Sequence, residues 1–144
     1  MKEKLLETAR SLQPPSKETA DEFGAKREKL AARCTEIFEE RDDLDSLVGE
    51  KNIRMAADNN RNFARFMESV FTGYDPPVLV ETVFWVFRAY RAHGFQTTYW
   101  AANLNIWLEV LEDELSEAAF AELQPFYTWL IVNIPIFTKL TEEK

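Results

Sequence analysis

The sequence predicts an all-α protein, arranged as an up-down antiparallel bundle of five or six helices. Apolar residues recur at helical spacing, and no alternating apolar-polar run is bounded by hairpin turns. Gly49, Gly73 and Gly94 fall where periodic segments stop, the usual place for a glycine that closes a helix in a left-handed conformation. Short links between long helices favour antiparallel neighbours. With 144 residues, 46% of them hydrophobic, we expect residues 1–144 to form a single helical-bundle domain, with residues 1–15 as an N-terminal arm helix.

The first half of the chain predicts three helices. The first covers about residues 2–12, because a residue that precedes a proline avoids the helical region and two prolines follow. Ser16 is placed to cap a second helix that continues to about residue 41. The third, at about residues 50–72, has an apolar face opposite a charged one. That apolar face contains Ile53, Ala56, Ala57, Phe63, Ala64, Met67, Val70 and Phe71.

The second half predicts the remaining helices. Asp75 is placed to cap the fourth, which runs to His93 and has two prolines in its first turn, where a missing N–H costs little. Thr97 and Ser116 are placed to cap the fifth and sixth helices in the same way. Pro135 is expected to kink or shorten the sixth, because proline has no N–H to bond within a helix.

Charge and composition limit the classes of partner. The 17 Lys and Arg against 25 Asp and Glu give a formal net charge of −8, which repels nucleic acid on average. A single cysteine allows no internal disulfide, and the first residues lack the apolar core of a signal peptide, so we expect a cytoplasmic protein. The longest apolar runs, residues 78–95 and 126–137, are shorter than the roughly 20 residues that cross a bilayer, so we expect no contact with a membrane.

The stretch VLVETVFWVFRAYRAHGF, residues 78–95, is apolar on two sides of one helix. Trp85 lies opposite the main apolar face, between Glu81 and Arg88. Such a helix is either covered all round by its neighbours or meets another chain through its second side. Because the sixth helix has the same excess of apolar surface, we expect a homodimer or a partner protein. The expected interface residues are Trp85, Phe84, Trp129, Val132 and Ile136.

The sequence contains no recognisable catalytic or metal-binding set. His93 precedes Gly94 in a last helical turn, where positive charge interacts well with the helix dipole; a haem or metal ligand is the alternative role. One histidine and one cysteine assemble neither a zinc site nor a di-iron carboxylate site. Cys34 lies on an apolar stripe with no histidine to activate it. We therefore expect no enzyme activity, no metal site and no cofactor.

Two amides lie on helix faces that should be dry. Asn60 interrupts the apolar face of the third helix, and Asn103 is one turn from two tryptophans of the fifth. A buried amide needs hydrogen-bond partners, so each either ties helices together or contacts a ligand. If a small molecule binds, we expect it between the third, fourth and fifth helices. The expected pocket residues are Asn60, Met67, Phe87, Tyr90, Trp100, Asn103 and Trp107.

From about Met55 onward, the order NFARFMESV, YDPPVLVETVFWVFRAYRAHGF and WAANLNIWLEVLEDEL resembles the helical subdomain that precedes the cobalamin-binding module in light-sensing regulators and related corrinoid proteins. In the light-sensing members, a tryptophan followed at fixed spacing by Glu-His caps the cobalamin. Trp107 is followed at that spacing by Glu117 but then by Ala118, so this ligand contact is not carried over. The companion module's Asp-x-His-x-x-Gly signature is also missing, because Arg stands two residues before the only histidine.

The chain also resembles the non-haem, globin-like sensor domains of bacterial stress-response regulators, which are helical, dimeric and acidic. Both resemblances imply a signalling or regulatory module. We therefore expect a non-enzymatic module of regulatory or sensory type that acts through protein contacts and binds a small apolar ligand. The alternative is a haem- or corrinoid-binding module with His93 as ligand. A third hypothesis is a helical enzyme that uses Glu109, Glu112 or Glu114 for proton transfer, which requires one of them to be buried in a cleft.

Overall fold

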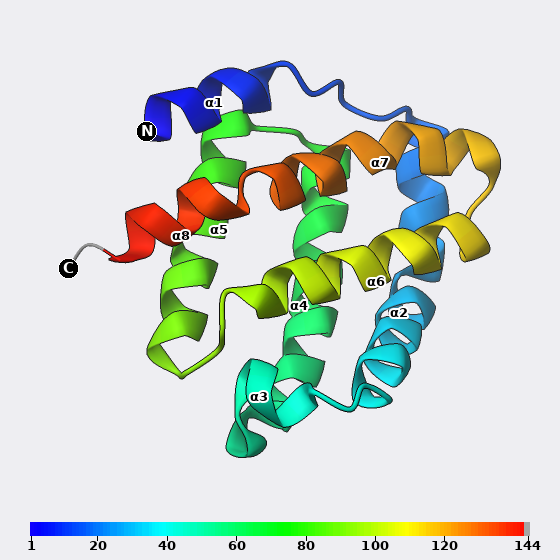
Figure 1. The fold of residues 1–144 in the computed structure, drawn as a ribbon. Coiled ribbons are helices and arrows are strands. Elements are labelled where there is room, and N and C mark those ends of the chain that lie inside the picture. Colours follow the sequence, from blue (N-terminus) through cyan, green and yellow to red (C-terminus); the bar gives the residue numbers. More distant parts are fainter. Residues whose placement is uncertain (143–144) are drawn as a thin grey trace.

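Helices make up all the regular structure in residues 1–142, the part of the chain that the structure describes. The computed structural model has eight α-helices and one 3-10 helix there and no β-strand, so the predicted all-α class is confirmed (Figure 1). None of these helices combines the length and the apolar character needed to cross a membrane. The elements are α1 (Lys2–Arg10), α2 (Lys17–Glu39), α3 (Leu44–Val48), the 3-10 helix η1 (Glu50–Asn52), α4 (Ile53–Thr72), α5 (Pro76–Ala92), α6 (Thr98–Glu114), α7 (Glu117–Val132) and α8 (Ile134–Glu142).

Three of the four predicted N-caps are confirmed. Ser16 Oγ accepts a hydrogen bond from Thr19 N at 3.2 Å, Asp75 Oδ1 from Val78 N at 3.4 Å, and Ser116 Oγ from Ala119 N at 3.2 Å. Thr97 makes no such bond, so its prediction is wrong. Its backbone is already helical (φ −64°, ψ −25°), whereas a capping side chain needs an extended backbone to reach the free N–H groups.

Helix ends depart from prediction in a few places. Gly49 and Gly94 have φ of +86° and +95°, as expected of glycines that follow helices, whereas Gly73 has φ −152° and is not left-handed. The sequence did not predict the short helix α3. The expected effect of Pro135 is confirmed: α7 ends at Val132 and α8 begins at Ile134. A proline at 135 has no N–H to donate to the carbonyl four residues before it, which removes one helical hydrogen bond where α7 gives way to α8.

The helices cross rather than alternate simply up and down. Figure 1 shows α2, α4 and α5 running steeply, with α6, α7 and α8 crossing in front of them. The main neighbour of α4 is α2, whereas α5 packs against α1 and α8. Helices α4 and α5 are consecutive but are not each other's main partners. The predicted count of five or six helices in an up-down bundle is therefore not confirmed.

Helices α2 and α7 cap each other's N-termini. Glu122 of α7 accepts hydrogen bonds from Ser16 N at 2.6 Å and from Thr19 Oγ1 at 2.7 Å, at the start of α2. Glu22 of α2 accepts from Ser116 N at 2.7 Å and from Ser116 Oγ at 2.9 Å, at the start of α7. These bonds hold the pKa of each carboxyl below its usual range, because they are made to the charged form. Each carboxylate also faces the positive end of the other helix.

Candidate functional site

A cavity of about 280 Å³ lies between α4 and α5 and extends to α6. At about 30 Å³ for each water, that volume holds roughly nine water-sized groups, which is enough for a small organic molecule. Its position follows from the packing, because α5 is held against α1 and α8 rather than against α4. The lining residues are Asn59, Asn62, Phe63 and Phe66 of α4, Thr82, Val83, Val86, Phe87 and Tyr90 of α5, Trp100, Asn103 and Leu104 of α6, and Leu130 of α7.

The structure brings together four of the seven residues expected to line a pocket. These four, Phe87, Tyr90, Trp100 and Asn103, all line the cavity. The other three, Asn60, Met67 and Trp107, are buried in the core and do not line this cavity. Sequence reasoning missed Asn59, although the helical spacing of Asn59, Asn62, Phe63 and Phe66 marks a common face.

Asn60 ties three helices together. It is 1% exposed, and its Oδ1 accepts hydrogen bonds from Trp107 Nε1 at 3.0 Å and from Asn103 Nδ2 at 2.8 Å. Its Nδ2 donates to Thr35 Oγ1 at 3.1 Å. The side chain thus connects α4 to both α6 and α2. This is the structural role open to a buried amide that does not itself meet a ligand.

The same network fixes which end of the Asn103 amide is free. An indole N–H donates and does not accept, so the Asn60 atom beside Trp107 is the oxygen. The Asn103 atom bonded to that oxygen is therefore the amide nitrogen. The Oδ1 of Asn103 is left buried without a hydrogen-bond partner in the described part of the chain. Asn103 itself lines the cavity, but this oxygen is covered by its neighbours.

A second unpartnered polar atom belongs to another residue of the same wall. Among residues 1–142, Trp100 Nε1 is also buried without a hydrogen-bond partner, and Trp100 lines the cavity one turn before Asn103. Its ring is held by stacking on Phe87, with centroids 4.7 Å apart and an interplanar angle of 18°. The ring of Tyr90 meets it at 5.6 Å and 62°. The Tyr127 hydroxyl is likewise unpartnered within that range, but Tyr127 does not line the cavity.

The cavity is electrically neutral. None of the described residues that line it has a carboxylate, ammonium, guanidinium or imidazole group. Its one phenol belongs to Tyr90, and burial raises the pKa of that phenol above its ordinary value, with a smaller contribution from Asp58. Tyr90 is therefore uncharged at neutral pH. Such a lining suits an uncharged ligand, because an isolated charge placed there would lose its hydration without gaining a counter-charge.

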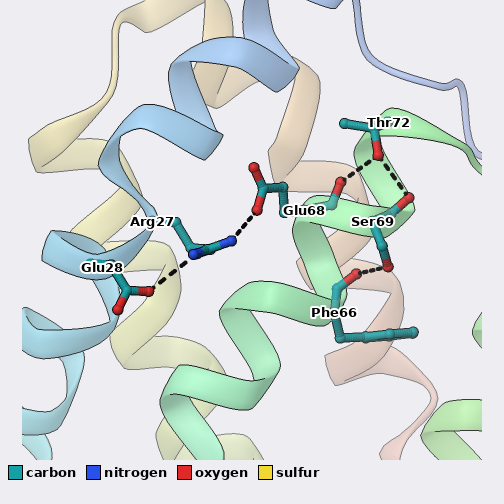
Figure 2. Close-up of polar contacts among 6 residues, drawn as sticks. All are labelled: Arg27, Glu28, Phe66, Glu68, Ser69 and Thr72. Carbon is teal, nitrogen blue, oxygen red and sulfur yellow. Dashed lines mark hydrogen bonds and ion pairs between the residues drawn. The ribbon is translucent and has the colours of Figure 1, made fainter.

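Figure 2 shows how the back of α4 is held to α2. Arg27 of α2 points toward Glu68 of α4 and forms an ion pair with it, and Arg27 Nε also donates to Glu28 Oε2 at 3.1 Å. A Cβ atom at Gly24 would collide with the Glu68 carboxylate, so the glycine leaves room for that group. Phe66 points away from Arg27 and lines the cavity. The α2 contact therefore anchors one wall of the cavity from behind.

The five residues expected at an interface have different environments. Trp85 and Val132 are 60% and 66% exposed, whereas Phe84 and Ile136 are half-buried. Trp129 is only 6% exposed, and its Nε1 donates at 2.8 Å to a threonine hydroxyl of α1. Trp129 therefore presents little surface of its own, and its place in an interface stays a prediction. Helix α1 covers a side of α7 that the local sequence pattern marked as exposed.

The side chains considered for cofactor binding or proton transfer lie outside the cavity lining. His93 is exposed and follows the last residue of α5. Glu109 and Glu112 are exposed, and Glu114 is half-buried and forms an ion pair with Lys29 at 2.9 Å. Within residues 1–142, no cluster of three or more His, Cys, Asp and Glu side chains could hold a metal ion.

Comparisons with family models, with curated proteins and with solved structures found no match for this chain.

Proposed function

We propose that the chain is a non-enzymatic, cytoplasmic module of regulatory or sensory type that binds a small apolar ligand between α4, α5 and α6. The observation that carries the proposal is a mainly apolar cavity of about 280 Å³ whose lining also includes a few polar side chains, among them Asn59, Asn62 and Thr82. Apolar walls with a few placed polar groups are the usual composition of a small-molecule site. The resemblance to sensor and corrinoid-associated helical domains supports a regulatory role.

The packing offers a way for binding to be read out. A ligand in the cavity contacts α4 and α5 together, two helices that otherwise rest on different neighbours. A bound ligand therefore stabilises the distance between α4 and α5 at which it contacts both helices. Binding shifts the protein toward that arrangement. Helix α5 also exposes Trp85 on its outer side. A change in the position of α5 would thus alter the protein's surface.

Titration with the neutral fluorescent reporter N-phenyl-1-naphthylamine tests ligand binding. We expect saturable fluorescence enhancement with the wild-type protein, and loss of that enhancement in Val86→Trp, which places a large ring at the α5 wall of the cavity. Val132→Trp is the matched control, because it makes the same change at an exposed position away from the cavity. Absence of saturable enhancement would refute the proposal. Haemin titration in the same series, read by visible absorption, tests the alternative with His93 as ligand.

We also propose that Trp85 mediates self-association. Trp85 lies on the outer side of α5, about one turn after Glu81 and one turn before Arg88. The Arg88 guanidinium lies 5.7 Å from the centre of the Trp85 ring. In a two-fold, antiparallel pairing of two α5 helices centred on Trp85, Glu81 of one copy faces Arg88 of the other. The pattern of Glu81 and Arg88 is therefore self-complementary and favours a second copy of the chain, which would share Glu81 with Lys2 of α1, 3.1 Å away within one copy.

Light scattering at tens of micromolar tests the association. We expect a dimer that weakens in Arg88→Glu, where the facing charges repel, and recovers in Glu81→Arg combined with Arg88→Glu, where complementarity is restored. A monomer in the wild type, or no recovery in the double variant, would count against this arrangement.

A further inference from the structure

We infer that the ligand is an uncharged single-chain amphiphile with about nine carbon atoms in the cavity, lying along α4 and α5 with its polar end beside Asn59 and Tyr90. This inference rests on the proposed function and specifies the chemistry of the molecule that the site takes. It follows from the shape of the cavity and from the positions of its polar side chains.

The cavity is long and narrow. Its lining on α4 runs from Asn59 to Phe66 and its lining on α5 from Thr82 to Tyr90, about 10 and 12 Å at 1.5 Å per residue. A volume of about 280 Å³ spread over about 11 Å leaves a cross-section of about 25 Å², close to that of one extended hydrocarbon chain. Space for roughly nine water-sized groups then corresponds to a chain of about nine carbons.

The two ends of the cavity differ in chemistry. Helices α4 and α5 run in opposite directions (Figure 1), so the start of the lining on α4 lies beside the end of the lining on α5. Asn59 and Tyr90 therefore share one end. Burial raises the pKa of Tyr90, and the charge of Asp58, the residue before Asn59, adds to that shift, which agrees with this pairing. Phe66 and Val83 lie toward the other end, which is mainly apolar.

The polar end offers groups that a ligand can reach. Asn59 Nδ2 donates to Tyr99 Oη at 2.7 Å, and the hydrogen bonds of the described residues give Asn59 Oδ1 no partner. Unlike Asn103 Oδ1, it is not among the unpartnered side-chain atoms of residues 1–142 that are fully covered. A phenol hydroxyl both donates and accepts, so the Asn59 amide keeps its bond to Tyr99 with either end toward the cavity. A head group that donates and accepts, such as a hydroxyl, suits both orientations and also suits the Tyr90 hydroxyl.

Asn62 and Thr82 stand at the rim of the cavity. Asn62 is exposed, whereas Thr82 is half-buried and lies one turn from the exposed Val78 and Trp85. Water at the rim therefore pairs with their polar groups, and the ligand's chain lies on the apolar part of the lining. That part consists of Phe63, Phe66, Val83, Val86, Phe87, Leu104 and Leu130.

Displacement of bound N-phenyl-1-naphthylamine by straight-chain 1-alkanols, from pentanol to dodecanol and each below its solubility limit, tests the chain. We expect the affinity to rise about fourfold for each added carbon up to about nine carbons and then to level off, because further carbons find no cavity to fill. Phe66→Ala removes a ring from the apolar end and should move this limit to longer chains. Phe84→Ala is the matched control, because Phe84 is a half-buried phenylalanine outside the cavity lining.

Three molecules of similar length test the polar end: 1-nonanol, 1-chlorooctane, which lacks the hydroxyl, and nonanoate, which is charged at pH 8. We expect nonanoate to need a concentration at least about tenfold higher than 1-nonanol, because the described lining has no counter-charge. Asn59→Leu should lower the ratio of the nonanol and chlorooctane affinities about fivefold or more, and Tyr90→Phe should lower it too. Asn105→Leu is the matched control, because Asn105 is an exposed asparagine outside the lining.

The outcomes separate the two levels of proposal. If the reporter binds but the alkanols fail to displace it, show no chain-length limit, or keep the same limit in Phe66→Ala, the inference is overturned while the apolar site stands. An unchanged ratio in both Asn59→Leu and Tyr90→Phe overturns the placement of the polar end. If neither the reporter nor any alkanol binds, the proposed function itself fails. Should Asn59→Leu not fold, Tyr90→Phe, which removes a single oxygen, still decides where the polar end lies.

Discussion

Replacing Asn60 by alanine will destabilise the protein more than the same replacement at its neighbour Asn59. Both side chains are buried, at 1% and 5% exposed, and both substitutions delete the same atoms. Their hydrogen bonding differs. The Asn60 side chain forms hydrogen bonds with three other side chains. The Asn59 side chain forms one, in which its Nδ2 donates to Tyr99 Oη at 2.7 Å. The pair therefore isolates the effect of the polar network from that of lost volume.

The expected magnitudes follow from the groups left unpaired. Without Asn60, Trp107 Nε1 and Asn103 Nδ2 both lose their acceptor inside the core. Each buried donor left unsatisfied costs about 1–3 kcal/mol, so Asn60→Ala is expected to lower the free energy of unfolding by about 2–6 kcal/mol from this source. Asn59→Ala leaves only the Tyr99 hydroxyl short of a partner, at about 1–3 kcal/mol. The expected difference is about 1–3 kcal/mol.

Urea unfolding followed by far-ultraviolet circular dichroism measures the difference, provided that the slope with denaturant is the same for all variants. A second measurement repeats Asn60→Ala in a Trp107→Phe background. There the indole donor is already absent, so the same substitution should cost less, and the coupling energy reports the Asn60–Trp107 bond. Equal losses for the two asparagine variants, or no coupling to Trp107, would refute the account of Asn60 as the hub of the network.

Three further outcomes are expected. Glu122→Gln should destabilise the protein at pH 7. Because the pKa of Glu122 is lowered in the folded state, the stabilisation by this carboxylate is full above the unfolded-state pKa of about 4.3 and is lost as the pH falls through the folded-state pKa. The difference in stability between wild type and variant, measured by urea unfolding, should therefore close in acid. Gly24→Ala alone should leave the stability nearly unchanged, because displacement of the Glu68 carboxylate offsets a gain of about 1 kcal/mol in helix propensity. In a Glu68→Ala background the same substitution should stabilise the protein by about 1 kcal/mol. Thermal or urea unfolding measures both effects. Burial raises the pKa of the Cys34 thiol, so an aromatic disulfide reagent should react with it only as urea unfolds the chain, in parallel with the loss of circular dichroism.

Much of the fold was predictable because the long helices carry strong local signals. Ser16, Asp75 and Ser116 mark helix starts by a mechanism that involves only the next three residues. Helix α3 was missed because five residues span little more than one turn, too short for an apolar period to repeat. The crossing arrangement was missed because it depends on which distant helices pack together, and loop length alone does not determine that.

The candidate site shows the same division between local and distant information. Asn59 and Asn60 are adjacent on α4 and point about 100° apart around the helix. Which of them meets the cavity depends on where α5 lies relative to α4, and the pattern within α4 does not report this. Trp129 was placed at an interface for a similar reason, since the helix that covers it, α1, comes from the opposite end of the chain.

The mutual capping of α2 and α7 also bears on the order in which the protein folds and unfolds. Glu22 and Glu122 each lie six residues after the serine that caps their own helix, and each bonds to the serine of the other helix, across a separation of about 100 residues. Closing so long a loop carries a large entropy loss, so contacts of this kind tend to form after shorter-range helix pairs are in place. An interaction absent from the folding transition state slows unfolding without speeding folding. The two carboxylates therefore act mainly on how long the native state persists once it has formed.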